Sequence, residues 1–347
     1  MSAPAYQAIL FTSFGGPEGM DDVMPYLDNV LRGRNIPEAR KLEVAEHYYA
    51  FGGVSPINAQ NRSLIEALQK ELREHGLDIP IYFGNRNWKP FIEEAVQQMA
   101  DDGVRRALAL VTSGYSCYSG CRQYRENIAA AREAVGDRAP VIDKIRVFYN
   151  HPDWVEVNRQ QVEEAFARLP AESRADALLL FTAHSIPGAM AAGSRYEIQL
   201  TEAARLVAEA LGHERWRLVY QSRSGPPHQP WLEPDVCDVI EALPEEGVTD
   251  VVIAPIGFIS DHMEVLYDLD EEAKEACERL GIRMARAASA GTHPLFVRML
   301  RELIEERLTE DPQRKAVGRF GPNHDVCPEG CCAYERPAGR PAAATTA

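Results

Sequence analysis

The sequence contains no apolar run of the ~20 residues that a membrane-spanning helix needs. Its longest apolar runs, such as Ala107–Val111 and Val251–Ile256, have the length of strands. Positive charge is also scarce, because 37 Lys and Arg stand against 52 Asp and Glu and give a net charge of −15. A surface of this sign repels nucleic-acid phosphates and anionic lipid. We therefore expect a chain that neither binds nucleic acid nor associates stably with a membrane.

Several common motifs are missing as well. No G-x-G-x-x-G, G-x-x-x-x-G-K-[ST] or G-x-S-x-G follows a strand-like run, which argues against dinucleotide, nucleoside-triphosphate and serine-hydrolase chemistry. The N-terminus has no basic segment before a long apolar stretch, so neither a signal nor a transit peptide is expected. These absences predict a cytoplasmic protein, and its acidic surface is compatible with a monomer.

What the sequence does contain is an alternation of short apolar runs with amphipathic stretches. Runs of this kind are typical of parallel strands covered on both faces. The strand-like runs are 8–14, 79–83, 107–112, 177–181, 218–221 and 251–258, and the helix-like stretches are 61–75, 91–101, 154–169, 201–211 and 294–308. The pattern predicts an α/β protein built from βαβ units as doubly wound parallel sheets.

A weak internal similarity indicates two such units. Gly103–Ser116 and Gly247–Ser260 share their length, opening dipeptide and Gly-aromatic ending. We predict a first Rossmann-like lobe over residues 1–150, a second over 151–316, and a Cys-containing C-terminal segment over 317–347. Within that segment, the Pro- and Ala-rich tail from Glu335 is expected to be disordered.

Candidate metal-binding side chains follow two of the apolar runs. His184 comes directly after one run and Glu264 shortly after another. Ligands of parallel sheets bind beyond the carboxyl ends of the strands, so both groups are expected at one edge. An imidazole with one carboxylate suits Fe²⁺ or Zn²⁺ and can also exchange protons with a substrate. The alternative at this stage is that His184 caps a turn and Glu264 lies at a solvated helix start.

Five of the seven cysteines form two concentrations. Cys117 and Cys121 lie in YSCYSGC, and three more lie in CPEGCC, namely Cys327, Cys331 and Cys332. Thiolates gathered in this way typically bind zinc or an iron–sulfur cluster. Four ligands are needed, so the fourth is expected from the Cys117–Cys121 loop.

Several longer motifs together resemble the ferrochelatase family, whose members are lyases that insert ferrous iron into a porphyrin. The resemblance runs from about Tyr6 to Leu308 and rests on ILFTSFGGPEG, FGGVSPIN, YFGNRNWKPFIEEAV, FTAHSIP, YQSRSGPPHQPWLEPDV and GFISDHMEVLYDLD. It implies two Rossmann-like lobes around a porphyrin cleft. It also implies that His184 and Glu264 bind Fe²⁺ and accept the pyrrole protons.

The resemblance further implies a set of porphyrin contacts. Phe14 corresponds to the position beneath the porphyrin centre, and Ser55 and Tyr124 correspond to positions that contact the propionates. Arg32 or Arg34 could add charge complementary to carboxylates. Because the region after the first Gly-Gly-Pro is charged rather than apolar, the chain looks like the soluble bacterial type that acts on coproporphyrin III in haem biosynthesis. Protoporphyrin IX is the alternative substrate.

Some ferrochelatases carry a [2Fe–2S] cluster, and the resemblance implies one here. Cys121, Cys327, Cys331 and Cys332 are the predicted ligands, and Cys117 is the alternative to Cys121. Two other functions stay open: a cobalt or nickel chelatase of the same fold class, and a non-catalytic haem-binding or iron–sulfur sensor. Transient contact with neighbouring haem-pathway enzymes is the expected partnership.

Overall fold

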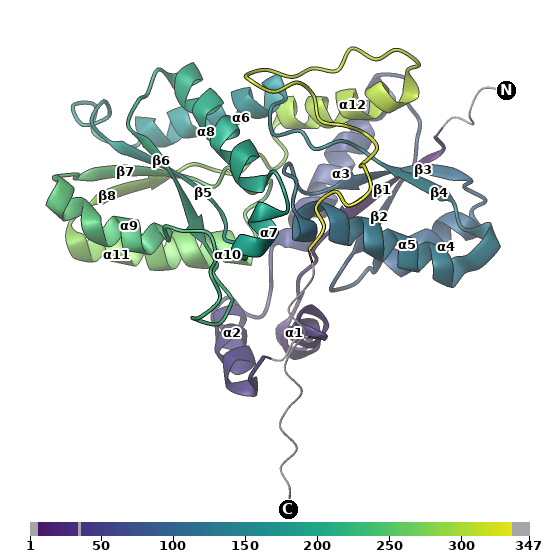
Figure 1. The fold of residues 1–347 in the computed structure, drawn as a ribbon, viewed down its shortest axis with the longest axis horizontal. Helices are drawn as coiled ribbons and strands as arrows, with labels where there is room; N and C mark the ends of the chain where they lie inside the picture. Colours follow the sequence, from purple (N-terminus) through teal and green to yellow (C-terminus); the bar gives the residue numbers. More distant parts are fainter. Residues whose placement is uncertain (1–5, 34–35, 335–347) are drawn as a thin grey trace, which may run out of the picture.

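The protein contains two four-stranded parallel sheets in a computed structural model that describes residues 6–33 and 36–334 (Figure 1). The first sheet has the order β2-β1-β3-β4, with β1 (Ala8–Ser13), β2 (Ile81–Asn85), β3 (Arg106–Val111) and β4 (Val141–Lys144). The second sheet has the order β6-β5-β7-β8, with β5 (Leu178–His184), β6 (Trp216–Gln221), β7 (Asp250–Ala254) and β8 (Arg283–Arg286). The predicted α/β class is confirmed.

The segments that resemble each other in sequence hold equivalent places in the two sheets. Gly103–Ser116 contains β3 and Gly247–Ser260 contains β7, and each of these strands is third in its sheet. Strands β1 and β5, which begin the two similar apolar runs, are both second. The weak sequence similarity therefore reflects a repeated topology.

Central strands are more deeply buried than edge strands, and the two most polar edge strands escaped prediction. Every residue of β1 and β7 is buried, as expected for strands paired on both sides and covered on both faces. The edge strands β4 and β8 carry the sequences VIDK and RMAR and are mostly half-buried. Neither of these two polar sequences was predicted as a strand, whereas the more apolar edge strands β2 (IYFGN) and β6 (WRLVYQ) were.

Helices cover both faces of each sheet. One hydrophobic cluster runs over one face of both sheets and contains side chains of α3 (Ile57–Glu74), α6 (Pro152–Ala167), α8 (Tyr196–Leu211) and α12 (Pro294–Leu308). The opposite face of the first sheet packs on α4 (Ile92–Asp101) and α5 (Gln123–Val135), and that of the second packs on α9 (Val236–Ala242) and α11 (Lys274–Leu280). In Figure 1, α6, α8 and α12 lie along the upper side of the molecule.

Helix α12 lies where the two halves meet. Its apolar stripe is at most 1% exposed and comprises Phe296, Leu300, Leu303 and Ile304. The helix contacts both α3, which precedes β2, and α6, which precedes β5. The core is thus continuous across the chain, and the predicted division into 1–150, 151–316 and 317–347 stays a prediction.

The remaining helices are two N-terminal helices and several short elements. Helices α1 (Val23–Leu31) and α2 (Glu38–Ala50) project below the sheets in Figure 1. The short elements are α7 (Gly188–Ala192), α10 (Met263–Val265), the π-helical η2 (Tyr118–Arg122) and η5 (Leu266–Ala273), and the 3₁₀ turns η1 (Met20–Asp22), η3 (Gly136–Arg138) and η4 (Leu243–Glu246). No helix among the described residues has the length and hydropathy for a bilayer crossing. The tail predicted to be disordered, 335–347, lies outside the described residues.

Candidate functional site

His184 and Glu264 meet at the carboxyl edge of the second sheet. His184 is the last residue of β5, and Glu264 lies in α10, which follows the neighbouring strand β7. Because parallel strands end at the same edge, the two side chains come together although 79 positions separate 184 from 264. The His184 Nε2 lies 3.6 Å from the Glu264 Oε2, and the side chains are 30% and 40% exposed. The pair is therefore open to an incoming ion.

The two groups hold each other in charged form. Burial by itself lowers the pKa of His184, but the Glu264 carboxylate and the Ser185 carbonyl outweigh burial and raise it to about 9. Burial raises the pKa of Glu264, and the imidazole of His184 reverses this effect and lowers it to about 2. The Nδ1–H of His184 donates to the Ser185 carbonyl oxygen. Nε2 is thereby the ring atom that faces the carboxylate.

A second carboxyl group, Asp268, stands one helical turn beyond Glu264. Burial raises its pKa to about 7, and the hydroxyl of Ser222 opposes this shift by donating to the carboxylate. The Gln221 side chain donates to both the Glu264 carbonyl oxygen, at 3.0 Å, and Asp268 Oδ2, at 3.2 Å. Asp268 can hence accept a proton near neutral pH. Asp268 was not predicted from the sequence, although a carboxylate four residues after Glu264 is a pattern that indicates a neighbouring acid on the same helix face.

An aromatic and apolar cluster lies beside this pair. Met263, next to Glu264, is 4% exposed and packs with buried side chains of the N-terminal region, namely Val23, Tyr26, Leu27, Ala45, Tyr48 and Trp88. Phe14 is partly buried against the same cluster. The structure thus brings Phe14 and the metal-site segment into one neighbourhood.

Arg86 connects two of the predicted porphyrin contacts and was not predicted itself. Its guanidinium carbon lies 5.6 Å from the centre of the Phe14 ring and 4.8 Å from that of the Tyr124 ring. Arg86 also donates to Asn127 Oδ1 and to the Ser119 carbonyl oxygen, both at 3.1 Å. Its position follows from the contact of the residue after β2 with Asn127 of α5, which no local motif signals.

The other predicted contacts lie at the N-terminal helices. Ser55 is 4% exposed, and its N–H donates to the Pro17 carbonyl oxygen at 2.9 Å. Arg32 follows α1 and donates to Asn29 Oδ1 at 2.5 Å, whereas Arg34 lies outside the described residues. Two apolar side chains of this region are also about half exposed, Met20 at 52% and Leu42 at 49%.

The cysteines gather as a possible ligand set. The thiol of Cys121 contacts those of Cys327 and Cys332, and these contacts lower the pKa of Cys121 and raise those of its two partners. Cys331 Sγ lies 3.8 Å from Cys332 Sγ. Four sulfur donors therefore converge from two distant segments, a donor set that suits an iron–sulfur cluster.

Cys117 belongs to a different environment from Cys121. Its sulfur accepts the N–H of Gly120 at 3.1 Å, inside its own turn. The C-terminal loop that carries Cys331 contacts η2 next to Cys121. There Arg122, the last residue of η2, donates to the Cys331 carbonyl oxygen at 3.2 Å. The geometry thus favours Cys121 as the fourth ligand, and this choice stays a prediction.

Comparison with known proteins shows which family the chain resembles over most of its length. The family model for ferrochelatase matches residues 6–308. The chain is 57% identical to a ferrochelatase of Rhodopirellula baltica, over 95% of this chain and 94% of that protein. It is 50% identical to a coproporphyrin III ferrochelatase of Streptomyces coelicolor, over 99% of this chain and 97% of that protein.

A solved structure shares the fold at low identity. SirB from Bacillus subtilis, determined with Fe³⁺, aligns with a TM-score of 0.56 and 12% identity over 87% of this chain and 96% of SirB. A likeness at this identity concerns the arrangement of the sheets and helices alone.

Proposed function

The chain belongs to the ferrochelatase family, and we propose that it inserts Fe²⁺ into coproporphyrin III to give the iron chelate, coprohaem, in haem biosynthesis. The observation that carries this proposal is the half-buried but accessible His184–Glu264 pair at 3.6 Å. The relatives named for coproporphyrin III supply the substrate class.

The pair can serve both halves of the reaction. Insertion releases two pyrrole protons. When the porphyrin is bound near Glu264, this carboxylate accepts the first of them. Before iron binds, His184 Nε2 must pass its own proton to the Glu264 carboxylate, 3.6 Å away, and from there to solvent, because only its free lone pair can bind Fe²⁺. Asp268, with a pKa raised to about 7 by burial, can then take protons onward from Glu264 at neutral pH. A site with so few protein ligands binds iron weakly and can release it to the porphyrin nitrogens.

Cationic and polar groups near Phe14 support a substrate with four carboxylates. The guanidinium of Arg86 lies 5.6 and 4.8 Å from the centres of the Phe14 and Tyr124 rings, and a guanidinium binds carboxylates through paired hydrogen bonds. Arg32 adds an exposed charge beyond α1. Met20 and Leu42, which are about half exposed, favour the alternative substrate, protoporphyrin IX.

A parallel assay distinguishes these substrates. Anaerobic Fe²⁺ insertion into the two porphyrins is measured without detergent. We expect kcat/KM to be roughly tenfold or more higher for coproporphyrin III, since one additional charged hydrogen bond contributes about 1.5–3 kcal/mol. Equal or reversed preference would overturn the substrate assignment and leave the family chemistry in place.

The metal pair is tested separately. The His184→Ala variant should lose insertion while it keeps porphyrin binding, measured by fluorescence quenching. The matched control is His228→Ala, which alters an exposed loop imidazole. Full turnover in the His184→Ala variant would refute the metal site. Tight haem retention without turnover in the unaltered protein would instead support the sensor function.

A [2Fe–2S] cluster bound by Cys121, Cys327, Cys331 and Cys332 is the cofactor that we propose. Its support is the convergence of Cys121 with Cys327 and Cys332. Such a cluster would supply a structural tie or a redox sensor, because insertion of Fe²⁺ transfers no electrons. The Cys121→Ser variant should lose the visible absorbance of the cluster, whereas Cys117→Ser, four residues away, should keep it. The opposite result would make Cys117, and not Cys121, the fourth ligand.

We also propose that the protein acts in the cytoplasm as a monomer, with transient contacts to neighbouring haem-pathway enzymes. All seven cysteines are free of disulfides, which suits a reducing compartment. The net charge of −15 disfavours self-association. Size-exclusion chromatography with light scattering tests the oligomeric state.

A further inference from the structure

The segment that carries Glu264 is attached to both halves of the molecule. In the second half, Arg286 at the end of β8 pairs with Asp261 and Asp270, at 3.1 and 2.5 Å, on either side of Glu264. His184, in contrast, belongs to β5 of the second sheet alone. The relative position of the two metal-site groups therefore depends on what holds the segment 261–270.

The N-terminal helices make three separate contacts with this segment. The first is a reciprocal pair of hydrogen bonds from α3: Gln60 Nε2 donates to the Asp261 carbonyl oxygen, and the Asp261 N–H donates to Gln60 Oε1, both at 2.9 Å. One side-chain amide thus satisfies both backbone groups of one residue, as a neighbouring strand would. Asp261 lies three positions before Glu264, so this pair sets the start of α10.

The second and third contacts lie beyond Asp261. Met263 is buried against the aromatic side chains of α1 and α2, Tyr26 and Tyr48. His47 of α2 stacks on Tyr267 of η5, with ring centroids 3.9 Å apart and planes 12° apart. Together the contacts bracket Glu264 on both sides and come from elements that carry no group of the metal pair.

We propose that Gln60 and His47 are positioning residues, which orient the Glu264 carboxylate toward His184 through Asp261 and Tyr267. The metal pair is then complete only when α2 and α3 are seated on the segment 261–270. Ser55, a predicted propionate contact, precedes Gln60 by five residues. Binding of a porphyrin at the N-terminal helices would hence change the orientation of the Glu264 carboxylate at the iron site. This inference rests on the proposed function of the His184–Glu264 pair.

The first test removes the reciprocal hydrogen bonds. The Gln60→Leu variant keeps the side-chain volume and should bind Zn²⁺, used as a probe without porphyrin, roughly fivefold or more weakly, as expected when ordinary hydrogen bonds are lost. Its KM for Fe²⁺ should rise while porphyrin affinity stays unchanged. Gln60→Glu keeps the acceptor for the Asp261 N–H. Its Zn²⁺ affinity should therefore lie between those of Gln60→Leu and the unaltered protein.

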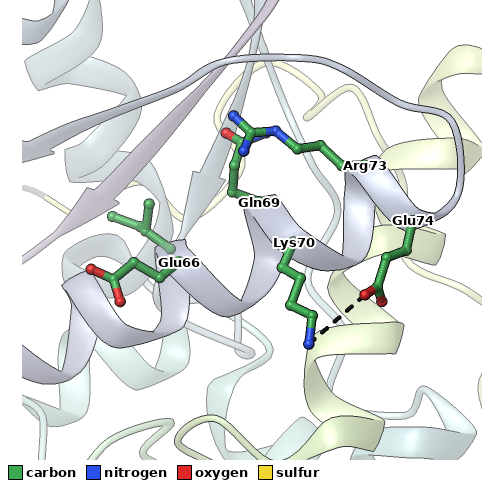
Figure 2. A pocket seen from close by; sticks show the side chains of 6 residues that line it. Glu66, Gln69, Lys70, Arg73 and Glu74 are labelled. Atoms are coloured by element: carbon green, nitrogen blue, oxygen red, sulfur yellow. Dashed lines mark ion pairs between the residues drawn. The ribbon is translucent and has the colours of Figure 1, made fainter.

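The matched control is Gln69→Leu on the same helix. Gln69 lies in a shallow hollow on the outer face of α3 (Figure 2) and donates to the Ile79 carbonyl oxygen at 3.1 Å. This variant loses a similar hydrogen bond far along the helix and should bind Zn²⁺ as the unaltered protein does. For the stack, His47→Phe should preserve Zn²⁺ affinity and His47→Ala should reduce it.

A double-mutant cycle separates positioning from general destabilisation. In a Glu264→Ala background, Gln60→Leu should have no further effect on Zn²⁺ affinity, because the carboxylate that it orients is gone. Equal losses in both backgrounds, or unchanged Zn²⁺ affinity in Gln60→Leu, would overturn the inference. If Glu264→Ala alone leaves Zn²⁺ binding and turnover intact, the proposed metal site itself fails.

Discussion

At the scale of single residues, the chemistry rests on how His184 and Glu264 change each other. Burial alone would favour the neutral form of both groups. Their separation of 3.6 Å reverses this tendency, raises the pKa of the imidazole to about 9 and lowers that of the carboxyl to about 2. The pair therefore stays charged across neutral pH until iron or a pyrrole proton disturbs it.

This pairing predicts a shifted titration. In the metal-free protein, the imidazole of His184 should titrate near pH 9, and Glu264→Gln should lower its pKa because burial then acts without the carboxylate. Nuclear magnetic resonance of the imidazole carbons measures both values. A pKa that is the same in the two proteins would show that Glu264 does not hold the proton on His184.

The same shifts predict how stability depends on pH. A raised His184 pKa stabilises the fold fully below about pH 6.5 and loses that effect as the pH rises through about 9. A lowered Glu264 pKa stabilises it above about pH 4.5 and loses that effect as the pH falls toward 2. Both contributions are fully present between about pH 4.5 and pH 6.5. In this range the unfolding free energy of the protein should exceed that of Glu264→Gln by the largest amount.

At the scale of elements, close approach of backbone segments places the turn after β1. A Cβ on Gly16 would lie 2.6 Å from the Ser55 Cβ and 2.8 Å from an Ile57 methyl carbon. The glycine therefore allows the turn after β1 to lie directly on the start of α3. This contact positions Ser55 and, five residues later, Gln60.

Gly16→Ala should lower the free energy of unfolding by about 1–3 kcal/mol, the usual cost of overpacking. Gly19→Ala is the matched control in the same loop, because its backbone is extended and no atom lies within 4 Å of an added Cβ. Urea denaturation followed by circular dichroism measures both. Equal stability of the two variants would contradict the tight approach.

At the scale of the whole molecule, a buried ion pair ties the C-terminal helix to the first half. Arg146, just after β4, donates to both carboxylate oxygens of Glu306 in α12, at 2.7 and 2.8 Å, and to the Lys315 carbonyl oxygen at 2.9 Å. The two side chains are 0% and 6% exposed. Removing one partner would leave the other charge buried without compensation.

Arg146→Ala should consequently lower the free energy of unfolding by about 3–5 kcal/mol. Lys70→Ala provides the control, because the Lys70–Glu74 pair drawn in Figure 2 is 3.8 Å long and largely exposed. Its loss should change stability by no more than about 0.5 kcal/mol. Denaturant unfolding compares the two, and similar small losses would show that the Arg146 pair is dispensable.

Local patterns along the chain predict the alternation of strands and helices, the α/β class and the positions of His184 and Glu264 after strand-like runs. These features depend on local patterns: apolar runs with the length of strands, amphipathic repeats, and the rule that parallel strands end at one edge. The helix predicted over 294–308 is an example, since its bounds and its buried stripe are those of α12.

Which distant side chains share an environment depends instead on the three-dimensional packing of the chain. It placed Arg86 beside the rings of both Phe14 and Tyr124, turned Cys121 rather than Cys117 toward the C-terminal thiols, and buried Asp268 enough to raise its pKa. Each result depends on side-chain direction and burial, which are set by packing between segments far apart in the chain. A local pattern records the backbone preference of one segment and carries no information about that packing.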